Sequence, residues 1–447
     1  MGGEPDKDPE DEFRDMLREF LSGESVIDPS QLAGAAGLPN DPASIQQLLG
    51  QLQNALQNPG GGVNWDLATQ QARTLAGQGA HSVTPAEHAT LDQAFHVAAL
   101  WLDGATTVAG LPGAPELIGR AEWARQTMPL WTQLAEPVAL SISDALTRVL
   151  TEHAPEEMQG MIQNAGALMR SVGGALFAMQ LGQAVGQLSK EVVSGGDIGI
   201  PLLTEGTAAL VPQNVAEFGE GLDIPADQVQ LYLAVRELAH ARLFRHAKWL
   251  RLQLITQITA FAKGITIDTA RLESLAENFD PANPEELREA MVSGALIPQK
   301  SEEQLETLGR LETMLALIEG WVDVVTASAT GLLPRAGAIA ETVRRRRASG
   351  GPAESAFATL VGLELRPRRL REAAAMWRAV TEAVGQEGRD ALWSHPDLLP
   401  EPSDLDDPSQ FVARLTALAS GEEPERDAVD QAIEDLLRED GERPAEG

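Results

Sequence analysis

The amino-acid sequence predicts a mainly α-helical protein. Apolar residues recur at three- and four-residue spacing over long stretches, as on the buried face of a helix. Aromatic residues make up only 4% of the chain, and the alternating β-branched runs that are typical of strands are scarce. With 447 residues and 43% hydrophobic content, the chain is long enough for two or three packed cores.

The expected helices follow from this periodicity and from capping signals. Thr84-Pro85-Ala86-Glu87 has the pattern of a capping box with proline in the first turn, and Ser301 begins another capped helix. A short apolar run at 198–203 predicts a strand. The predicted helices are 44–57, 66–78, 84–108, 116–133, 137–152, 155–193, 211–218, 226–263, 268–277, 284–292, 301–328, 334–347, 368–384 and 408–418.

The two ends of the chain differ in composition from its middle. Residues 1–60 are acidic and punctuated by Gly and Pro, which predicts a flexible N-terminal arm. Residues 421–447 hold 11 acidic residues against three arginines, so this end of the acidic C-terminal tail, 401–447, is expected to be disordered. The helical domain is expected at 61–400, with a sub-boundary near 194–225.

Charge and cysteine content exclude several classes of protein. The formal net charge of −32 argues against a protein that binds nucleic acid or an anionic membrane as a whole. Without cysteine there is neither a disulfide framework nor a thiolate zinc site. The N-terminus is acidic and lacks an apolar signal core, which predicts a cytoplasmic protein.

The most apolar stretch, 165–186, is expected to be a buried helix and not a membrane span. One arginine and two glutamines interrupt it, and a spanning helix needs about 20 predominantly apolar residues. Small residues at this spacing allow two helices to approach closely. They recur every four positions, at Gly174, Ala178, Gly182 and Gly186.

The functional prediction depends on the stretch 226–252. No Gly or Pro occurs between Pro225 and Lys263, so one long helix is expected. At its middle lies Arg236-Glu-Leu-Ala-His240. With His in place of Arg236 this would be H-E-x-x-H, in which two imidazoles one turn apart bind zinc and the Glu acts as base. Arg236 itself cannot be a ligand, because a guanidinium stays protonated and offers no lone pair.

A partner for this motif is expected on helix 301–328, where Glu319 and Asp323 lie four residues apart on one face. Glu319 stands in a mostly apolar run, so it is expected to point into the protein. A buried carboxylate needs a metal, a cation or several donors. Zinc bound by His240, Glu319 and Asp323 would satisfy it, and so would an ion pair with Arg236. The residues leave both alternatives open.

The segment Arg236-Glu-Leu-Ala-His-Ala-Arg-Leu-Phe, with Trp249-Leu-Arg after it, resembles the central motif of a bacterial family of zincin-like candidate hydrolases. The family is commonly labelled zinc-dependent metalloproteases, and a sister branch is associated with biosynthesis of coenzyme F420. Other segments resemble it too, and the similarity covers roughly 60–395. They are Val63-Asn-Trp-Asp, the glycine-spaced stretch from Gly174, Asp197-Ile-Gly-Ile-Pro-Leu, Glu319-Gly-Trp-Val-Asp-Val-Val and Arg344-Arg-Arg-Arg.

The resemblance implies a multi-helix zincin-like bundle and a hydrolase that acts on a peptide or protein. In that expectation Glu237 is the base, and His240 and Glu319 lie near a zinc ion. Arg236, in place of the first histidine of the motif, is then the residue that this family itself uses at that position. The alternative, from another class, is a non-catalytic binding or scaffold protein. In it, Arg236, Glu237, His240 and Glu319 form a polar network in place of the metal.

Two further features have weaker functional interpretations. The turn Gly195-Gly-Asp-Ile-Gly lacks the Lys-Ser/Thr of a phosphate loop, so it is expected to be an ordinary turn, with Asp197 a remote candidate for the central site. The basic run Arg344–Arg347 is expected to cover acidic groups of the same protein or to hold an acidic partner segment, and nucleic acid is not an expected partner. A further hypothesis docks the acidic tail on basic residues of the central helix, namely Arg242, Arg245, Lys248 and Arg251.

Overall fold

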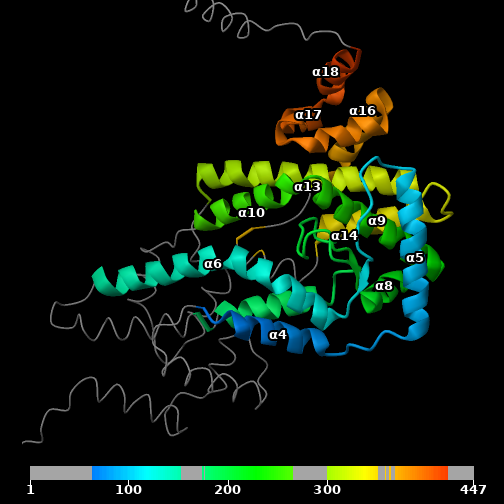
Figure 1. Cartoon of the computed structure of the whole chain (residues 1–447). Coiled ribbons are helices and arrows are strands. Elements are labelled where there is room, and N and C mark those ends of the chain that lie inside the picture. The colour runs from blue at the N-terminus through cyan, green and yellow to red at the C-terminus, as the bar shows by residue number, and fades with distance from the viewer. Residues whose placement is uncertain are drawn as a thin grey trace, which may run out of the picture.

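The computed structural model describes residues 63–152, 174–175, 177–264, 300–350, 358, 362–363 and 368–420, and of 142–152 the backbone alone. Helices dominate this part of the chain, so the prediction of a mainly α fold is confirmed (Figure 1). The predicted N-terminal arm, the helices predicted at 44–57, 268–277 and 284–292, and residues 421–447 lie outside the described residues. No described helix has both the length and the apolar character needed to cross a bilayer.

Side chains cap the start of the first two described helices, and the cap of the second was predicted. The side chain of Asn64 caps α4 (Trp65–Gly77) by accepting a hydrogen bond from a backbone N–H of the first turn at 3.2 Å. The capping box that begins α5 (Pro85–Asp103) is complete, because Thr84 and Glu87 each accept a hydrogen bond from the other's backbone N–H. Helix α5 then packs along α9, the helix that carries the predicted site.

Helix α6 (Arg120–Glu152) is longer than predicted. It runs through Pro129 and Pro137 without a break, so the prediction of separate helices at 116–133 and 137–152 was wrong. A proline costs a helix one hydrogen bond and a steric adjustment. Packing of α6 against α4 and α10 outweighs that loss.

The helical residues 177–188 contact α4 backbone to backbone. A Cβ on Gly182 would lie 2.5 Å from the carbonyl oxygen of Ala68, and one on Gly186 would lie 2.9 Å from Cβ of Leu75. The two glycines are therefore required by close packing, as the four-residue spacing of small residues predicts.

The described strands form one short parallel pair, β1 (Glu116–Leu117) with β2 (Ala209–Leu210). Ser194 adds an isolated antiparallel bridge to Leu210. The prediction of a strand at 198–203 was wrong, since these residues form a bent loop without strand pairing. Gly199 has a φ of 81° and bends the chain there, so the apolar side chains that follow are buried in the core without strand pairing.

Helix α8 (Pro212–Gly219) leads into α9 (Ala226–His246), and α10 (Lys248–Lys263) follows after one residue. The prediction of one helix over 226–263 was therefore wrong at Ala247, which has φ −90° and ψ 70°. Ala247 is buried, and the bend turns α10 into contact with α6 and α13. Tertiary packing sets this break, because no Gly or Pro marks it.

Helix α13 (Glu302–Ala329) separates two groups of helices (Figure 1). It contacts α9 and α10 on one side, and α16 on the other. Helices α17 and α18 pack against α16, so the part of the predicted C-terminal tail up to Ser420 is helical. The remaining elements are α14 (Ala336–Ser349), α16 (Leu370–Ala391), η2 (Leu392–Ser394), η3 (Pro396–Leu398), α17 (Pro402–Asp406) and α18 (Pro408–Ser420).

Three buried tryptophans fix α13 in place. Trp377 and Trp393 stack with ring centroids 5.5 Å apart, and Trp321 meets Trp393 edge-on at 6.4 Å. The indole N–H of Trp377 donates to the carbonyl oxygen of Leu317 at 2.8 Å, which ties α16 to the middle of α13. Large aromatic side chains dominate core energetics. This tryptophan cluster therefore keeps the helical turn of α13 that carries Glu319 rigid.

Candidate functional site

The site helix α9 lies in the middle of the protein and is buried on all sides from Tyr232 to Phe244. Such a helix has no solvent face, so the polar side chains of its central motif must find partners inside the protein. Helix α13 crosses α9 and supplies one of them, since Glu319 has 0% exposure.

The Glu319 carboxylate binds three basic side chains. Its Oε2 forms a short contact with a guanidinium nitrogen of Arg236, and its Oε1 lies 3.1 Å from Nε2 of His240 and 3.8 Å from Nη2 of Arg347. Burial alone would raise the pKa of Glu319, but Arg236, followed by Arg347 and His240, holds the pKa well below its usual range. Glu319 is therefore an anion in a closed ion-pair cluster.

Both ring nitrogens of His240 are engaged. Its Nδ1 lies 3.1 Å from the backbone carbonyl oxygen of Arg236, and its Nε2 faces Glu319 at the same distance. A carbonyl oxygen only accepts, so a hydrogen bond with it places a proton on Nδ1. Nε2 is then directed at the Glu319 carboxylate and not at open space.

Glu237 is held by backbone donors. Its Oε2 accepts from the N–H of Gly196 at 2.8 Å, and its Oε1 accepts from the N–H of Ala209 at 2.9 Å. Burial raises the pKa of Glu237, and hydrogen bonds from Ser194 and from these backbone groups offset part of the rise. The side chain therefore joins α9 to β2 and to the loop that begins at Ser194.

Asp323 does not join His240 and Glu319. Its two carboxylate oxygens accept from Nε and Nη2 of Arg344 at 3.1 Å and 3.0 Å, a bidentate pair. The structure thus brings together two residues of the predicted ligand set, and it places the third in a separate ion pair.

The basic run of α14 pairs with acidic residues of the same chain. Arg345 pairs with Glu341 and Arg346 with Asp197, at 2.9 Å and 3.4 Å. Arg347 donates to the carbonyl oxygen of Ile198 at 2.8 Å. Its place beside Glu319 was not predicted, although the four-residue spacing from the buried residues Ile339 and Val343 puts it on the same helix face.

The turn after Ser194 packs directly on the site. A Cβ on Gly196 would lie 2.9 Å from Cβ of His240, and one on Gly199 would lie 2.7 Å from Oε1 of Glu319. Gly195 is equally close to its surroundings, since its Cβ would lie 3.0 Å from Oε1 of Glu237. The sequence showed the dense glycines, but their role as the wall of the site was not predicted.

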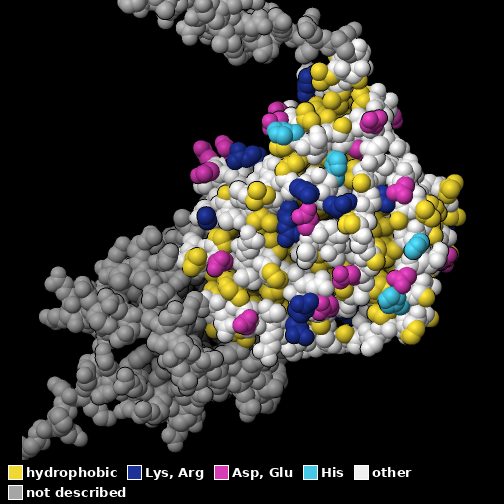
Figure 2. Space-filling model, viewed as in Figure 1, with side chains coloured by type: hydrophobic (Ala, Val, Ile, Leu, Met, Phe, Trp, Pro, Cys, Tyr) yellow, Lys and Arg dark blue, Asp and Glu magenta, His cyan; other side chains and the backbone are white. Residues whose placement is uncertain are grey.

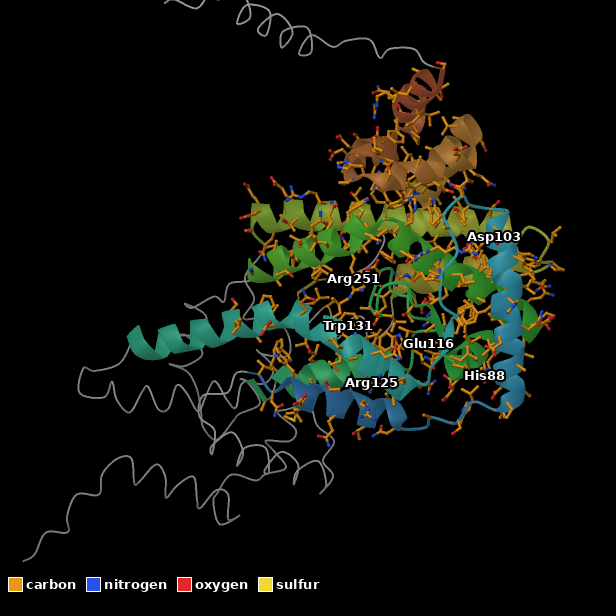
Figure 3. All side chains as sticks on the ribbon, in the orientation of Figure 1. His88, Asp103, Glu116, Arg125, Trp131 and Arg251 are labelled. Carbon is orange, nitrogen blue, oxygen red and sulfur yellow. The ribbon has the colours of Figure 1, made fainter. Side chains whose placement is uncertain are left out.

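A pocket of about 40 Å³ opens beside Glu237 and His240. Its other walls come from the residues after Ser194, which include Gly195, Gly196 and 201–207, and from the start of α10. Figure 3 shows Arg251, one of the lining residues, below α10 on the side toward the middle of the protein. In the space-filling view, several Lys and Arg side chains gather near the middle of the visible face (Figure 2).

Two comparisons place the protein among known families. Residues 63–412 match the profile of a family described as zincin-like metallopeptidase. The chain belongs to this family. It is also similar to the crystal structure of a candidate hydrolase with a novel fold from Chloroflexus aurantiacus, at 19% identity and a TM-score of 0.54. That match covers 79% of this chain and 98% of the other, and it shows a shared fold.

A search of curated proteins finds no match. Family membership confirms the predicted resemblance to zincin-like proteins. Neither comparison names coenzyme F420, so that link stays a prediction.

Membership in the zincin-like family implies zinc, but the residues of this site do not fit a zinc ion. Arg236 stands where a zincin has its first histidine, and Glu319 raises the pKa of this guanidinium further, although burial opposes its charge. Nε2 of His240 faces the Glu319 carboxylate, and Glu319 is itself paired with Arg236, so these groups are directed at one another and not at a shared metal position. Within the described residues, no three His, Asp or Glu side chains are grouped to hold a metal ion.

Proposed function

We propose that this zincin-like protein is a non-catalytic binding protein, with a polar network of Arg236, Glu237, His240 and Glu319 in place of the zinc. One observation carries the proposal: the Glu319 carboxylate is shared between Arg236 and His240 in a fully buried contact. The fixed positive charge of the guanidinium meets the need of a buried carboxylate for a cation. A peptide or protein partner and a cytoplasmic location belong to the same proposal.

Metal analysis tests this proposal. The protein is purified without added zinc, and its metal content is measured by mass spectrometry. We expect no stoichiometric zinc, and we expect the folded state to be unaffected by a chelator. Zinc at one ion per chain, lost in both His240→Ala and Glu319→Ala, would refute the proposal.

The second candidate is a zincin-like metal-dependent hydrolase, with Glu237 as base. Family membership favours it, and so does the pocket that Glu237 and His240 line. A fluorescent peptide mixture incubated with the protein and with added zinc separates the two candidates. Cleavage that disappears in Glu237→Ala supports the hydrolase, whereas the binding proposal predicts no cleavage under either condition.

A further inference from the structure

The pocket beside the polar network contains two basic residues, although the chain as a whole is strongly acidic. Its inner end is formed by Glu237 and His240, and its apolar walls include Leu203 and Phe244. Two basic residues, Lys248 and Arg251, lie in its lining. They are three residues apart on α10, so both face the same side of that helix. The chain as a whole has a formal net charge of −32.

Arg251 is anchored in the pocket by backbone carbonyl oxygens and forms no ion pair with a described carboxylate, although the charge of Glu205 acts on it. Its Nη1 donates to the backbone carbonyl oxygens of Pro201 and Leu203 at 2.9 Å and 2.8 Å. The residue is partly buried, and burial lowers the pKa of its guanidinium. Among the described carboxylates, none forms an ion pair with Arg251 or with Lys248. Two fixed carbonyl oxygens hold the guanidinium in one place, which favours recognition of an anion by its remaining N–H groups.

The other basic residues of this group do not line the pocket. Arg242 pairs with Asp103 at 2.8 Å, and Arg245 donates to the carbonyl oxygen of Gly110 at 2.8 Å. Lys248 and Arg251 are the two basic residues in the pocket lining. The acidic tail at 421–447, which a sequence hypothesis docked on all four, lies outside the described residues.

The acidic residues of the pocket do little to cancel this positive charge. Both oxygens of Glu237 accept hydrogen bonds from the backbone N–H groups of Gly196 and Ala209, and these donors face its negative charge. Glu205 is exposed to solvent at the rim, where water screens its charge. The charge that a ligand meets is therefore set by the two basic residues.

We propose that this pocket binds a carboxylate group, held by Lys248 and Arg251. The cavity of about 40 Å³ exceeds the roughly 10–15 Å³ that one water needs, so it has room for a few waters that a carboxylate can displace. A planar carboxylate matches the fork of a guanidinium, and Leu203 and Phe244 provide apolar surface in the same lining. The inference rests on the proposed binding function, for which it names the class of ligand.

A carboxylate can come from a small organic acid or from the C-terminus of a peptide. Isothermal titration calorimetry of the full chain distinguishes the two sources with three probes: succinate, N-acetyl-trialanine with a free C-terminus, and the same peptide with a C-terminal amide. We expect at least one of the two carboxylate probes, succinate or the free-acid peptide, to bind. If the carboxylate comes from a peptide C-terminus, the amidated peptide should bind at least tenfold more weakly than the free-acid peptide.

Variants on α10 locate the binding. Lys248→Gln and Arg251→Gln are each expected to weaken binding of the carboxylate probe at least tenfold, whereas Lys263→Gln, at the exposed end of the same helix, leaves it unchanged. Arg251→Gln loses two backbone contacts and is checked for folding by circular dichroism. Lys248 is exposed, so its variant decides the question if the other unfolds.

Three results would overturn the inference: neither carboxylate probe binds at millimolar concentration, inorganic phosphate binds more tightly than both, or Lys263→Gln has the same effect as Lys248→Gln. The metal analysis separates this failure from a failure of the proposed function. Stoichiometric zinc together with carboxylate binding that depends on Lys248 refutes only the metal-free function. Absence of both zinc and carboxylate binding refutes only the inference.

Discussion

The contact between Arg236 and Glu319 can be tested by a double-mutant cycle. The three variants are Arg236→Met, Glu319→Gln and the two changes combined. Each single change leaves one charge without its main partner inside the protein, because Arg236 is 5% exposed and Glu319 is 0% exposed. The combined change replaces both charges with neutral side chains of similar size.

The expected magnitude follows from this burial. Removing one partner of a buried ion pair costs about 3–5 kcal/mol, because the other charge remains uncompensated. For Arg236→Met the loss is expected at the lower end, since His240 and Arg347 still face the carboxylate. The double variant should be more stable than the sum of the single losses predicts, by about 1–3 kcal/mol of coupling between contacting residues.

The free energy of unfolding is measured by equilibrium urea titration of each variant, with and without a chelator. Arg345→Gln is the matched control, because its pair with Glu341 on the same face of α14 is exposed and is expected to contribute nothing measurable. Strictly additive single losses would show that the two side chains are not coupled, and the argument for a closed network would be wrong.

Two further predictions concern the turn at the site and a second buried ion pair. Gly199→Ala should destabilise the protein by about 1–3 kcal/mol, because its φ is positive and the new Cβ would meet Glu319. Gly221→Ala has a similar φ with open space around it, so thermal unfolding should show a smaller loss; equal losses would argue against steric contact. Asp390→Asn should cost about 3–5 kcal/mol at pH 7, because Arg389 beside it is 1% exposed. Burial opposes the charge of Asp390, but Arg389 lowers its pKa, so its contribution is present above about pH 4 and is lost as pH falls through the folded-state pKa. Urea titrations from pH 7 to 2 should therefore show that the free energy of unfolding falls less steeply with acidification in the variant than in the unchanged protein. An equally steep fall in both would contradict this assignment.

The sequence predicted the ends of helices well where a nearby residue determines them. The capping residues Thr84 and Ser301 begin helices as expected, since a cap depends only on residues within one turn. The bend at Ala247 and the continuous helix through Pro137 were not predicted. Both depend on what α6 and α10 pack against, and that information is spread over distant parts of the chain.

The candidate site could be predicted in part for the same reason. The apolar surroundings of Glu319 in the sequence indicate that it is buried, and the spacing in α9 places Arg236 and His240 on one face. The choice of Asp323 as a neighbour of His240 rested on helical spacing from Glu319 alone. Arg344 lies 21 residues further along the chain and is brought to Asp323 by the turn between α13 and α14, which periodicity does not reveal.

The cation that neutralises Glu319 is synthesised with the polypeptide. Unlike an exchangeable ion, Arg236 cannot be extracted by competing ligands, and acid does not release it, because a guanidinium keeps its proton at every pH at which proteins fold. Neutralisation of Glu319 therefore requires no ion from outside the chain.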